Sequence, residues 1–166
     1  MFNTIYECQL LGDDIKEEEK GKVNFGLTGA LAKDEQTGNI YNGVLLKWSE
    51  ALDSAMPTKR WRLYCFKGED LLENYYIHRK SSYCIGRDEK VCDLVCAHPS
   101  ISKQHAVIQY RAVNGKIKPY LMDLGSTNKT YLNGEELDDS RYYELKEKDL
   151  IKFGQSLREY VVICEK

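Results

Sequence analysis

The most constraining feature of this sequence is a long series of short apolar runs separated by turn residues. From Lys59 to the end, runs rich in Trp, Tyr, Val, Ile and Cys alternate with turn signals about every 8–12 residues. In HAVIQYRAV (105–113), every second side chain from Ala106 to Ala112 is apolar, whereas Gln109 and Arg111 point to the opposite face. No helical period interrupts this region. The pattern therefore predicts an all-β sandwich.

The turn signals fix the expected strand ends. Asn114-Gly115 and Asn133-Gly134 are pairs typical of two-residue hairpin turns. Strands are expected near Trp61–Phe66, Tyr75–His78, Tyr83–Gly86, Asp93–Val95, His105–Val113, Ile117–Asp123, Thr130–Leu132, Tyr142–Leu145, Leu150–Phe153 and Tyr160–Cys164.

The 166 residues suit one domain with a preceding extension. Residues 1–22 include a charge run and predict a flexible tail, residues 23–58 predict a largely unstructured arm, and residues 59–166 predict the sandwich. The arm could dock on a partner or on the sandwich itself, and the sequence leaves both open. Its candidate anchors are Phe25, Leu27, Leu31, Val44, Leu45 and Trp48.

Composition excludes several classes of protein. The 24 basic and 26 acidic residues give a net charge of -2, which provides no electrostatic footprint for direct, sequence-specific nucleic-acid binding. The six cysteines lie mostly inside apolar runs and are expected to be reduced. Acidic residues near the N-terminus and the lack of 18 consecutive apolar residues predict an intracellular, soluble protein with no membrane association.

Three polar loops carry the candidate chemistry: IGRD (85–88), HPSISKQH (98–105) and GSTNKT (125–130). Loops at one end of a sandwich converge on one surface. Together they offer a guanidinium, an ammonium, hydroxyls and an amide, which are the donors that a phosphate with about -1.5 to -2 charge requires. The candidate ligand-binding residues are Arg87, Ser102, Lys103, Thr127 and Asn128.

The order and spacing of GR, S-x-x-H, STN-x-T and NG resemble the forkhead-associated (FHA) domain family. This resemblance implies an eleven-stranded β-sandwich that binds phosphothreonine peptides through its loops. It makes Arg87 the main phosphate-binding arginine and Ser102 the phosphate-binding hydroxyl, with Lys103 as a neighbouring contact. Thr127 and Asn128 match residues that contact the bound threonine and the peptide backbone. Gly86, His105, Asn133 and Gly134 match positions that shape the loops.

One position departs from the family pattern. Lys129 follows STN, where FHA domains usually have Gly. If the turn needs a positive φ there, Lys costs on the order of 1 kcal/mol, and it also adds a cation near the peptide.

A closer resemblance runs from about Lys59 to Val162, and more weakly upstream through NFGLTGAL and NGVLLKWSEA. Over this length the chain resembles the family of the Smad nuclear-interacting protein and its fungal counterpart, the pre-mRNA leakage protein. The resemblance implies a nuclear subunit of the retention and splicing complex, which joins the spliceosome. It also implies that the arm binds the RNA-recognition-motif subunit of that complex.

Other interpretations remain. Arg87 could form an ion pair with Asp88 or Glu89. A phosphothreonine adaptor in DNA-damage or kinase signalling, or a structural splicing subunit with a vestigial pocket, would share the same motifs. A zinc site can be drawn from Cys92, Cys96, His98 and His105, but the reduced-core interpretation of the cysteines is favoured. Ser102 and His105 lack the surroundings of a hydrolase nucleophile. We expect no metal, no cofactor and no enzymatic activity.

Overall fold

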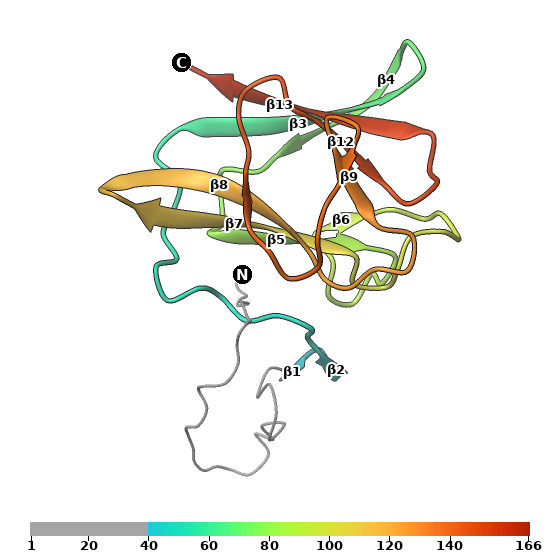
Figure 1. Ribbon diagram of the computed structural model, residues 1–166, viewed down its shortest axis with the longest axis horizontal. Coiled ribbons are helices and arrows are strands. Elements are labelled where there is room, and N and C mark those ends of the chain that lie inside the picture. Colours follow the sequence, from blue (N-terminus) through green and yellow to red (C-terminus); the bar gives the residue numbers. More distant parts are fainter. Residues whose placement is uncertain (1–39) are drawn as a thin grey trace.

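Two antiparallel-rich sheets pack face to face in the computed structural model, which describes residues 40–166 (Figure 1). The six-stranded sheet has the order β10 (Glu135–Glu136), β9 (Thr130–Leu132), β12 (Leu150–Phe153), β13 (Arg158–Glu165), β3 (Arg60–Lys67) and β4 (Asp70–Tyr76). The five-stranded sheet has the order β11 (Tyr143–Glu144), β8 (Lys116–Asp123), β7 (Ala106–Val113), β5 (Ser82–Gly86) and β6 (Leu94–Val95). The expected all-β sandwich of about eleven strands is confirmed.

The strand boundaries follow the turn chemistry of the sequence. Asn114 and Gly115, between β7 and β8, have φ values of 53° and 75°, as a tight hairpin with two left-handed residues requires. The expected strands agree with the structure in nearly every case. The strand predicted near Tyr75–His78 is wrong in its bounds, because β4 begins at Asp70 and ends at Tyr76. This edge strand is mostly exposed, so its sequence lacks the alternation that marks a half-buried strand. The two-residue strand β10 was also missed, because both its residues are exposed glutamates.

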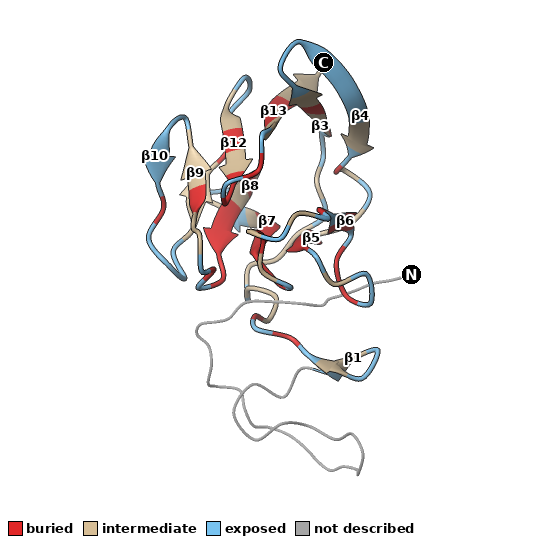
Figure 2. Cartoon of the chain, turned by 90° about the vertical axis from the view of Figure 1, so that its right-hand side faces the viewer, coloured by how far each residue is buried: buried red, intermediate tan, exposed pale blue. Residues whose placement is uncertain are grey.

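The main hydrophobic core lies between the two sheets, where the buried residues gather (Figure 2). As the alternation in β7 predicts, Ile108 and Tyr110 point into this core and are fully buried. The Tyr110 hydroxyl donates to the carbonyl oxygen of Ile77, so this buried polar group is satisfied. Phe153 and Tyr160 pack edge-on at 5.3 Å and link β12 to β13 within the same core.

Residues 40–58 cover the outer face of the five-stranded sheet (Figure 1). They contain only the two-residue strands β1 (Ile40–Tyr41) and β2 (Val44–Leu45), and backbone hydrogen bonds join Ala55 to Tyr110 and Asp53 to Ala112 of β7. Leu46 and Trp48 are 5% and 2% exposed and enter a second cluster with residues of β5, β7 and β8. This part of the arm therefore docks on the sandwich itself, which is one of the two possibilities that the sequence leaves open.

One candidate anchor packs within the protein. Trp48 is 2% exposed and lies against the sandwich, which is one of the two dockings that the sequence leaves open. Val44 is half-buried beside the same cluster, whereas Leu45 is 45% exposed. The anchors predicted at Phe25, Leu27 and Leu31 lie outside the described residues.

Polar contacts complete the docking of the arm. Gln109, buried on the outer face of β7, accepts from the Ala51 amide at 3.5 Å and donates to Ser54 Oγ at 3.1 Å. Arg111 forms a two-bond pair with the Asp53 carboxylate, both at 2.9 Å. The polar outer face of β7 is therefore a binding surface for the arm, and Gln109 is buried although it is polar.

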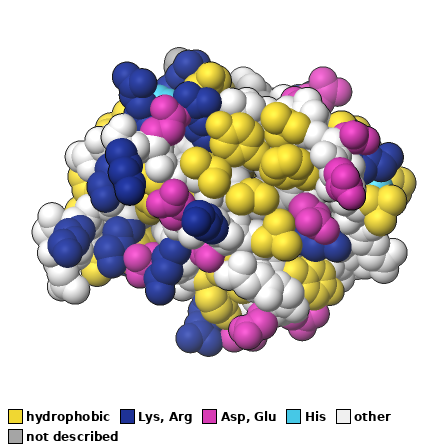
Figure 3. Space-filling view, turned by 90° about the horizontal axis from the view of Figure 1, so that it is seen from above, with side chains coloured by type: hydrophobic (Ala, Val, Ile, Leu, Met, Phe, Trp, Pro, Cys, Tyr) yellow, Lys and Arg dark blue, Asp and Glu magenta, His cyan; other side chains and the backbone are white. Residues whose placement is uncertain are grey.

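The opposite, outer face of the six-stranded sheet presents hydrophobic side chains among charged ones (Figure 3). Val161 of β13, Tyr64 of β3 and Asn74 of β4 are neighbours in register across this face. Among residues 40–166, no helix is long and apolar enough to cross a membrane.

Candidate functional site

Three loops meet at one end of the sandwich, as the sequence predicts. Arg87 follows β5, Ser102 and Lys103 precede β7, and Thr127 and Asn128 lie between β8 and β9. The Arg87 amide donates to the carbonyl oxygen of Ser102 at 3.1 Å, and the Thr127 amide donates to Ser102 Oγ at 3.3 Å. Ser102 thus contacts both neighbouring loops, and the structure brings the expected ligand-binding residues together.

Gly86 permits the closest approach between two of these loops. A Cβ atom at this position would lie 2.2 Å from the carbonyl oxygen of Lys103, which is far inside van der Waals contact. The same carbonyl accepts from the Asp88 amide at 3.2 Å and from Cys92 Sγ at 3.1 Å. Only glycine allows the loop that carries Arg87 to lie directly against the loop that carries Ser102.

The Arg87 side chain is exposed and largely uncommitted. Its Nε donates to the carbonyl oxygen of Ile101, which orients the guanidinium plane. Within residues 40–166, no carboxylate pairs with its two terminal nitrogens. Asp88 instead accepts from the Lys90 amide at 2.9 Å, as a short polar side chain at a turn commonly does. The ion pair considered between Arg87 and Asp88 is therefore absent from the described part of the chain.

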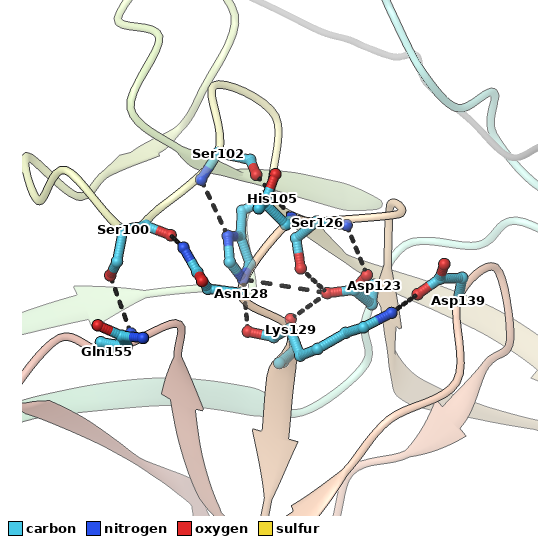
Figure 4. Close-up of polar contacts among 11 residues, drawn as sticks. Ser100, Ser102, His105, Asp123, Ser126, Asn128, Lys129, Asp139 and Gln155 are labelled. Carbon is cyan, nitrogen blue, oxygen red and sulfur yellow. Dashed lines mark hydrogen bonds and ion pairs between the residues drawn. The ribbon is translucent and has the colours of Figure 1, made fainter.

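His105 joins the second and third loops from below (Figure 4). Its Nδ1 accepts from the Ser102 amide at 3.1 Å, and its Nε2 donates to the carbonyl oxygen of Lys129 at 2.9 Å. These partners specify the neutral tautomer with the proton on Nε2. Burial lowers the pKa of His105, which is fully buried and packs edge-on against Phe153 at 5.5 Å.

The contact between His105 and Ser102 is to the backbone and not to the hydroxyl. A serine nucleophile would need a base in hydrogen-bond contact with its Oγ. Here Nδ1 accepts from the amide nitrogen, while Oγ accepts from Thr127. His105 therefore orders the loop and does not activate the serine.

A buried carboxylate holds the third loop, and sequence reasoning missed it. Asp123, at the end of β8, is fully buried and accepts from both the amide and the hydroxyl of Ser126, at 2.9 and 2.5 Å. The same carboxylate accepts from Thr130 Oγ1 at 2.6 Å. The spacing of an Asp at a strand end followed three residues later by Ser is typical of such local capping and could have revealed this role.

The Asn128 side chain joins the third loop to the second loop. Its Nδ2 donates to the carbonyl oxygen of Ser100 at 2.8 Å, while Ser100 Oγ accepts from the Gln155 amide at 2.8 Å (Figure 4). The Asn128 side chain is therefore oriented with its amide nitrogen inside the protein. No hydrogen bond to its carbonyl oxygen is found among residues 40–166.

Lys129 adopts the strained conformation that the departure from glycine suggested. Its φ is 66°, in the left-handed region that disfavours a side chain. The backbone carbonyl oxygen of Lys129 accepts two hydrogen bonds, one from His105 Nε2 and one from the Gly154 amide. Nζ bonds Asp139 Oδ1 at 3.1 Å, and this hydrogen bond raises the pKa of Lys129. The extra cation is thus neutralised within the protein.

The remaining predicted residues have separate places. Asn133 and Gly134 form the β9–β10 turn with φ values of 52° and 87°, and Asn133 Oδ1 accepts from the Leu150 amide at 2.9 Å. The residues of the considered zinc site do not converge: Cys92 Sγ lies 3.5 Å from Cys84 Sγ, whereas Cys96 Sγ contacts the Tyr160 hydroxyl at 3.1 Å. Within residues 40–166, no group of three or more His, Cys, Asp or Glu side chains could hold a metal ion.

Comparison with known proteins agrees with this geometry. Residues 83–154 match the family model described as the FHA domain. Pre-mRNA leakage protein 1 of Saccharomyces cerevisiae is 34% identical over 185 residues, which cover 90% of this chain and 89% of the yeast protein. The chain belongs to this family of FHA-domain proteins. Smad nuclear-interacting protein 1 of Mus musculus is 48% identical over 155 residues, covering 88% of this chain. That alignment covers only 40% of the mouse protein, so the chain spans less than half of its length.

Solved FHA structures have the same fold. Full-length yeast Pml1p matches with a TM-score of 0.65 and 27% identity, over 70% of this chain and 98% of that one. The MEK1 FHA domain in complex with a HOP1 phosphothreonine peptide matches with a TM-score of 0.51 and 28% identity, over 63% of this chain and 97% of that one. The three loops of this FHA domain are therefore set on a sandwich shared with a member that was solved with a phosphopeptide.

Proposed function

We propose that this chain is a phosphothreonine-peptide-binding scaffold subunit of a nuclear pre-mRNA retention and splicing complex. The observation that carries the proposal is the exposed Arg87 guanidinium, free of carboxylate partners among residues 40–166, on a loop whose backbone is hydrogen-bonded to Ser102. A cation without a carboxylate partner and a hydroxyl, on two loops that are hydrogen-bonded to each other, suit an anionic ligand.

The chemistry of the site fits a phosphate dianion on a peptide. The planar fork of Arg87 can donate to two phosphate oxygens at once, which an ammonium cannot do. Ser102 Oγ accepts from the Thr127 amide, so its own proton is available to a third oxygen. Lys103 is exposed beside it and adds charge. The free carbonyl oxygen of Asn128 is the acceptor for a backbone N–H of the peptide.

Relatives support the assignment to a splicing complex. One solved structure is described as the yeast Pml1 splicing factor and its integration into the RES complex, with 29% identity, a TM-score of 0.60, and coverage of 67% of this chain and 83% of that one. The mouse relative is named for interaction with a Smad protein in the nucleus. We extend the nuclear location and the splicing partners to this chain on that basis. The role is one of binding and assembly, without catalysis.

The arm provides the second contact in this proposal. Phe25, Leu27, Leu31 and the exposed Leu45 are the candidate contacts for the RNA-recognition-motif subunit. Two modest contacts on one chain increase the overall affinity for the assembly through effective concentration. The division into residues 1–22, 23–58 and 59–166 stays a prediction. Residues 46–55 of the arm also contact the sandwich.

Calorimetric titration with a degenerate phosphothreonine peptide library and its unphosphorylated counterpart tests the site. Arg87→Ala should abolish binding of the phosphorylated library. Arg79→Ala is the matched control, because Arg79 is an exposed arginine that precedes the opposite end of β5 and stacks on Tyr76 at 4.9 Å. Equal binding of both libraries, or no loss in Arg87→Ala, would overturn the proposal.

Co-purification from nuclear extract separates the assembly from its rivals. Spliceosome components on the wild-type chain support the proposed complex, whereas checkpoint kinases would indicate a signalling adaptor. Spliceosome components bound equally by the wild type and Arg87→Ala, with no peptide binding by either, would mean that the phosphate pocket is vestigial.

A further inference from the structure

The arm contacts the phosphate-binding loops as well as the sheet. Gln104 lies between Lys103 and His105 and is 5% exposed, although it is polar. Its Nε2 donates to the carbonyl oxygen of Leu45 at 2.9 Å, and its Oε1 accepts from the Lys47 amide at 2.9 Å. The Gln104 side chain thus donates one hydrogen bond to the arm backbone and accepts another from it, as the backbone of a neighbouring β-strand would.

A second contact reaches the loop that carries Arg87. Asn42, in the turn between β1 and β2, donates from Nδ2 to the carbonyl oxygen of Lys90 at 2.7 Å. The Lys90 amide in turn donates to Asp88, the residue after Arg87. Leu46 and Trp48 pack behind the same loop, against Val91 and Cys92.

The two loops held by the arm are also bonded to each other. The amides of Arg87 and Asp88 donate to the carbonyl oxygens of Ser102 and Lys103, at 3.1 and 3.2 Å. Cys92 Sγ donates to the second of these carbonyls. A displacement of either loop therefore displaces the other. The arm residues that restrain them, 42–48, lie outside the residues 83–154 that match the FHA family model.

We propose that residues 42–48 act as a brace that positions Ser102 and Lys103 for phosphate through the Gln104 side chain. The inference rests on the proposed phosphopeptide function and extends it. The binding site of this protein includes a positioning residue, Gln104, and an arm segment that touch no ligand. Pre-ordering the loops in this way reduces the entropy lost when the peptide binds.

The brace also links the two proposed binding events. A partner that contacts the exposed Leu45 acts on the residue whose carbonyl oxygen accepts from Gln104. A partner that stabilises residues 42–48 in their docked position therefore raises phosphopeptide affinity, and by thermodynamic reciprocity the phosphopeptide raises affinity for that partner.

The test compares two buried glutamines that bind the same arm at different distances from the loops. Gln104→Ala removes the brace to the loop, whereas Gln109→Ala removes the contacts to Ala51 and Ser54 on the sheet. The affinity of each full-length variant for a phosphothreonine peptide is measured by calorimetry, below the unfolding temperature of that variant. The peptide is one that the wild type binds in the library titration. Gln104→Ala should bind about three- to tenfold more weakly, the range expected for one or two hydrogen bonds, and Gln109→Ala should bind as the wild type.

A second variant guards against unfolding. Asn42→Gly removes the bond to Lys90 but keeps the positive φ of 51° at an exposed position, so the fold is not threatened. It should weaken peptide binding about twofold or more. Wild-type affinity in both Gln104→Ala and Asn42→Gly would overturn the brace.

Hydrogen exchange separates the failure of the brace from the failure of the proposed function. The Ser102 amide donates to His105 Nδ1, so its exchange reports the order of the loop without any ligand. Faster exchange at Ser102 in Gln104→Ala, but not in Gln109→Ala, supports the brace even if no phosphothreonine peptide binds. Unchanged exchange in Gln104→Ala would refute it.

Discussion

The Arg87 amide donates to the carbonyl oxygen of Ser102 at 3.1 Å, so the two main candidate phosphate-binding residues are joined through their backbones. The backbone bond fixes the two loops against each other, while Arg87 Nε donates to Ile101 and Ser102 Oγ accepts from the Thr127 amide. The approach depends on Gly86, directly before Arg87.

Gly86→Ala should separate the two loops. The added Cβ would meet the Lys103 carbonyl oxygen at 2.2 Å, and backbone atoms cannot rotate away as a side chain can. We expect the free energy of unfolding to fall by about 2 kcal/mol or more, together with loss of phosphopeptide binding. Urea denaturation and calorimetry measure the two effects. Gly68→Ala is the control, because a Cβ there meets nothing within 4 Å and costs only the strain of φ +64°; equal effects of both substitutions would refute the steric explanation.

Lys129→Gly should stabilise the domain. Glycine relieves the strain of φ 66°, and the exposed pair with Asp139 that is lost contributes little. Glycine also raises the conformational entropy of the unfolded chain, which offsets part of this gain. We therefore expect the free energy of unfolding to rise by about 0.5–1 kcal/mol. Thermal denaturation measures it. Lys129→Ala loses the same pair but keeps the strain, so a similar gain in that variant would show that backbone strain is not the cause.

His105 should make stability depend on pH in mildly acidic solution. Burial holds the folded-state pKa of His105 below the ordinary value of 6.5, although Asp123, with Oδ1 3.9 Å from Nε2, opposes this shift. Below about pH 6.5, His105 is protonated in the unfolded chain but stays neutral in the folded chain. The free energy of unfolding therefore falls as the pH drops below that value.

The measurement is urea denaturation at pH 7 and pH 5. Between pH 7 and pH 5, the free energy of unfolding of the wild type should fall by up to about 2 kcal/mol more than that of His105→Gln, because glutamine does not titrate. An NMR titration should show His105 still neutral where the unfolded chain is protonated. Equal pH dependence in the two proteins would contradict the expectation.

Trp48→Ala should show that part of the arm belongs to the folded domain. Its side chain is 2% exposed and packs in the second cluster, so truncation leaves a large cavity. We expect the free energy of unfolding to fall by about 3 kcal/mol. Leu45→Ala, three residues away and 45% exposed, should change it by less than about 0.5 kcal/mol. Urea denaturation of both variants, in one cooperative transition each, checks the prediction.

Local chemistry in the sequence was enough to predict the sandwich. The alternation in β7 and the Asn-Gly turn after it are contained within a few residues, and both appear in the structure as expected. The departure from the family's usual Gly raises the possibility of a positive φ at Lys129, and the structure has a φ of 66° there. The exposed strand β4 was placed wrongly, because it lacks the burial pattern on which such predictions depend.

Contacts between distant segments could not be predicted. The alternation in β7 assigned Gln109 to the polar face but gave no sign that residues 51–54 would cover it. Gln104 lay inside a recognised loop and had no motif of its own, and its two arm partners are 57 and 59 residues away. The apolar side chain of Trp48 suits a partner and the sandwich equally, so the sequence does not distinguish the two dockings.

The separation of these partners has a consequence for biosynthesis. The chain emerges from the ribosome N-terminus first, so residues 45–51 appear well before Gln104 and Gln109, to which they bond across 57 to 59 residues. During that interval Trp48 has no sheet to cover it, and the arm is open to nascent-chain chaperones or to an early assembly partner. Docking of the arm is therefore a late event in the maturation of the protein, and it coincides with completion of the loops that it supports.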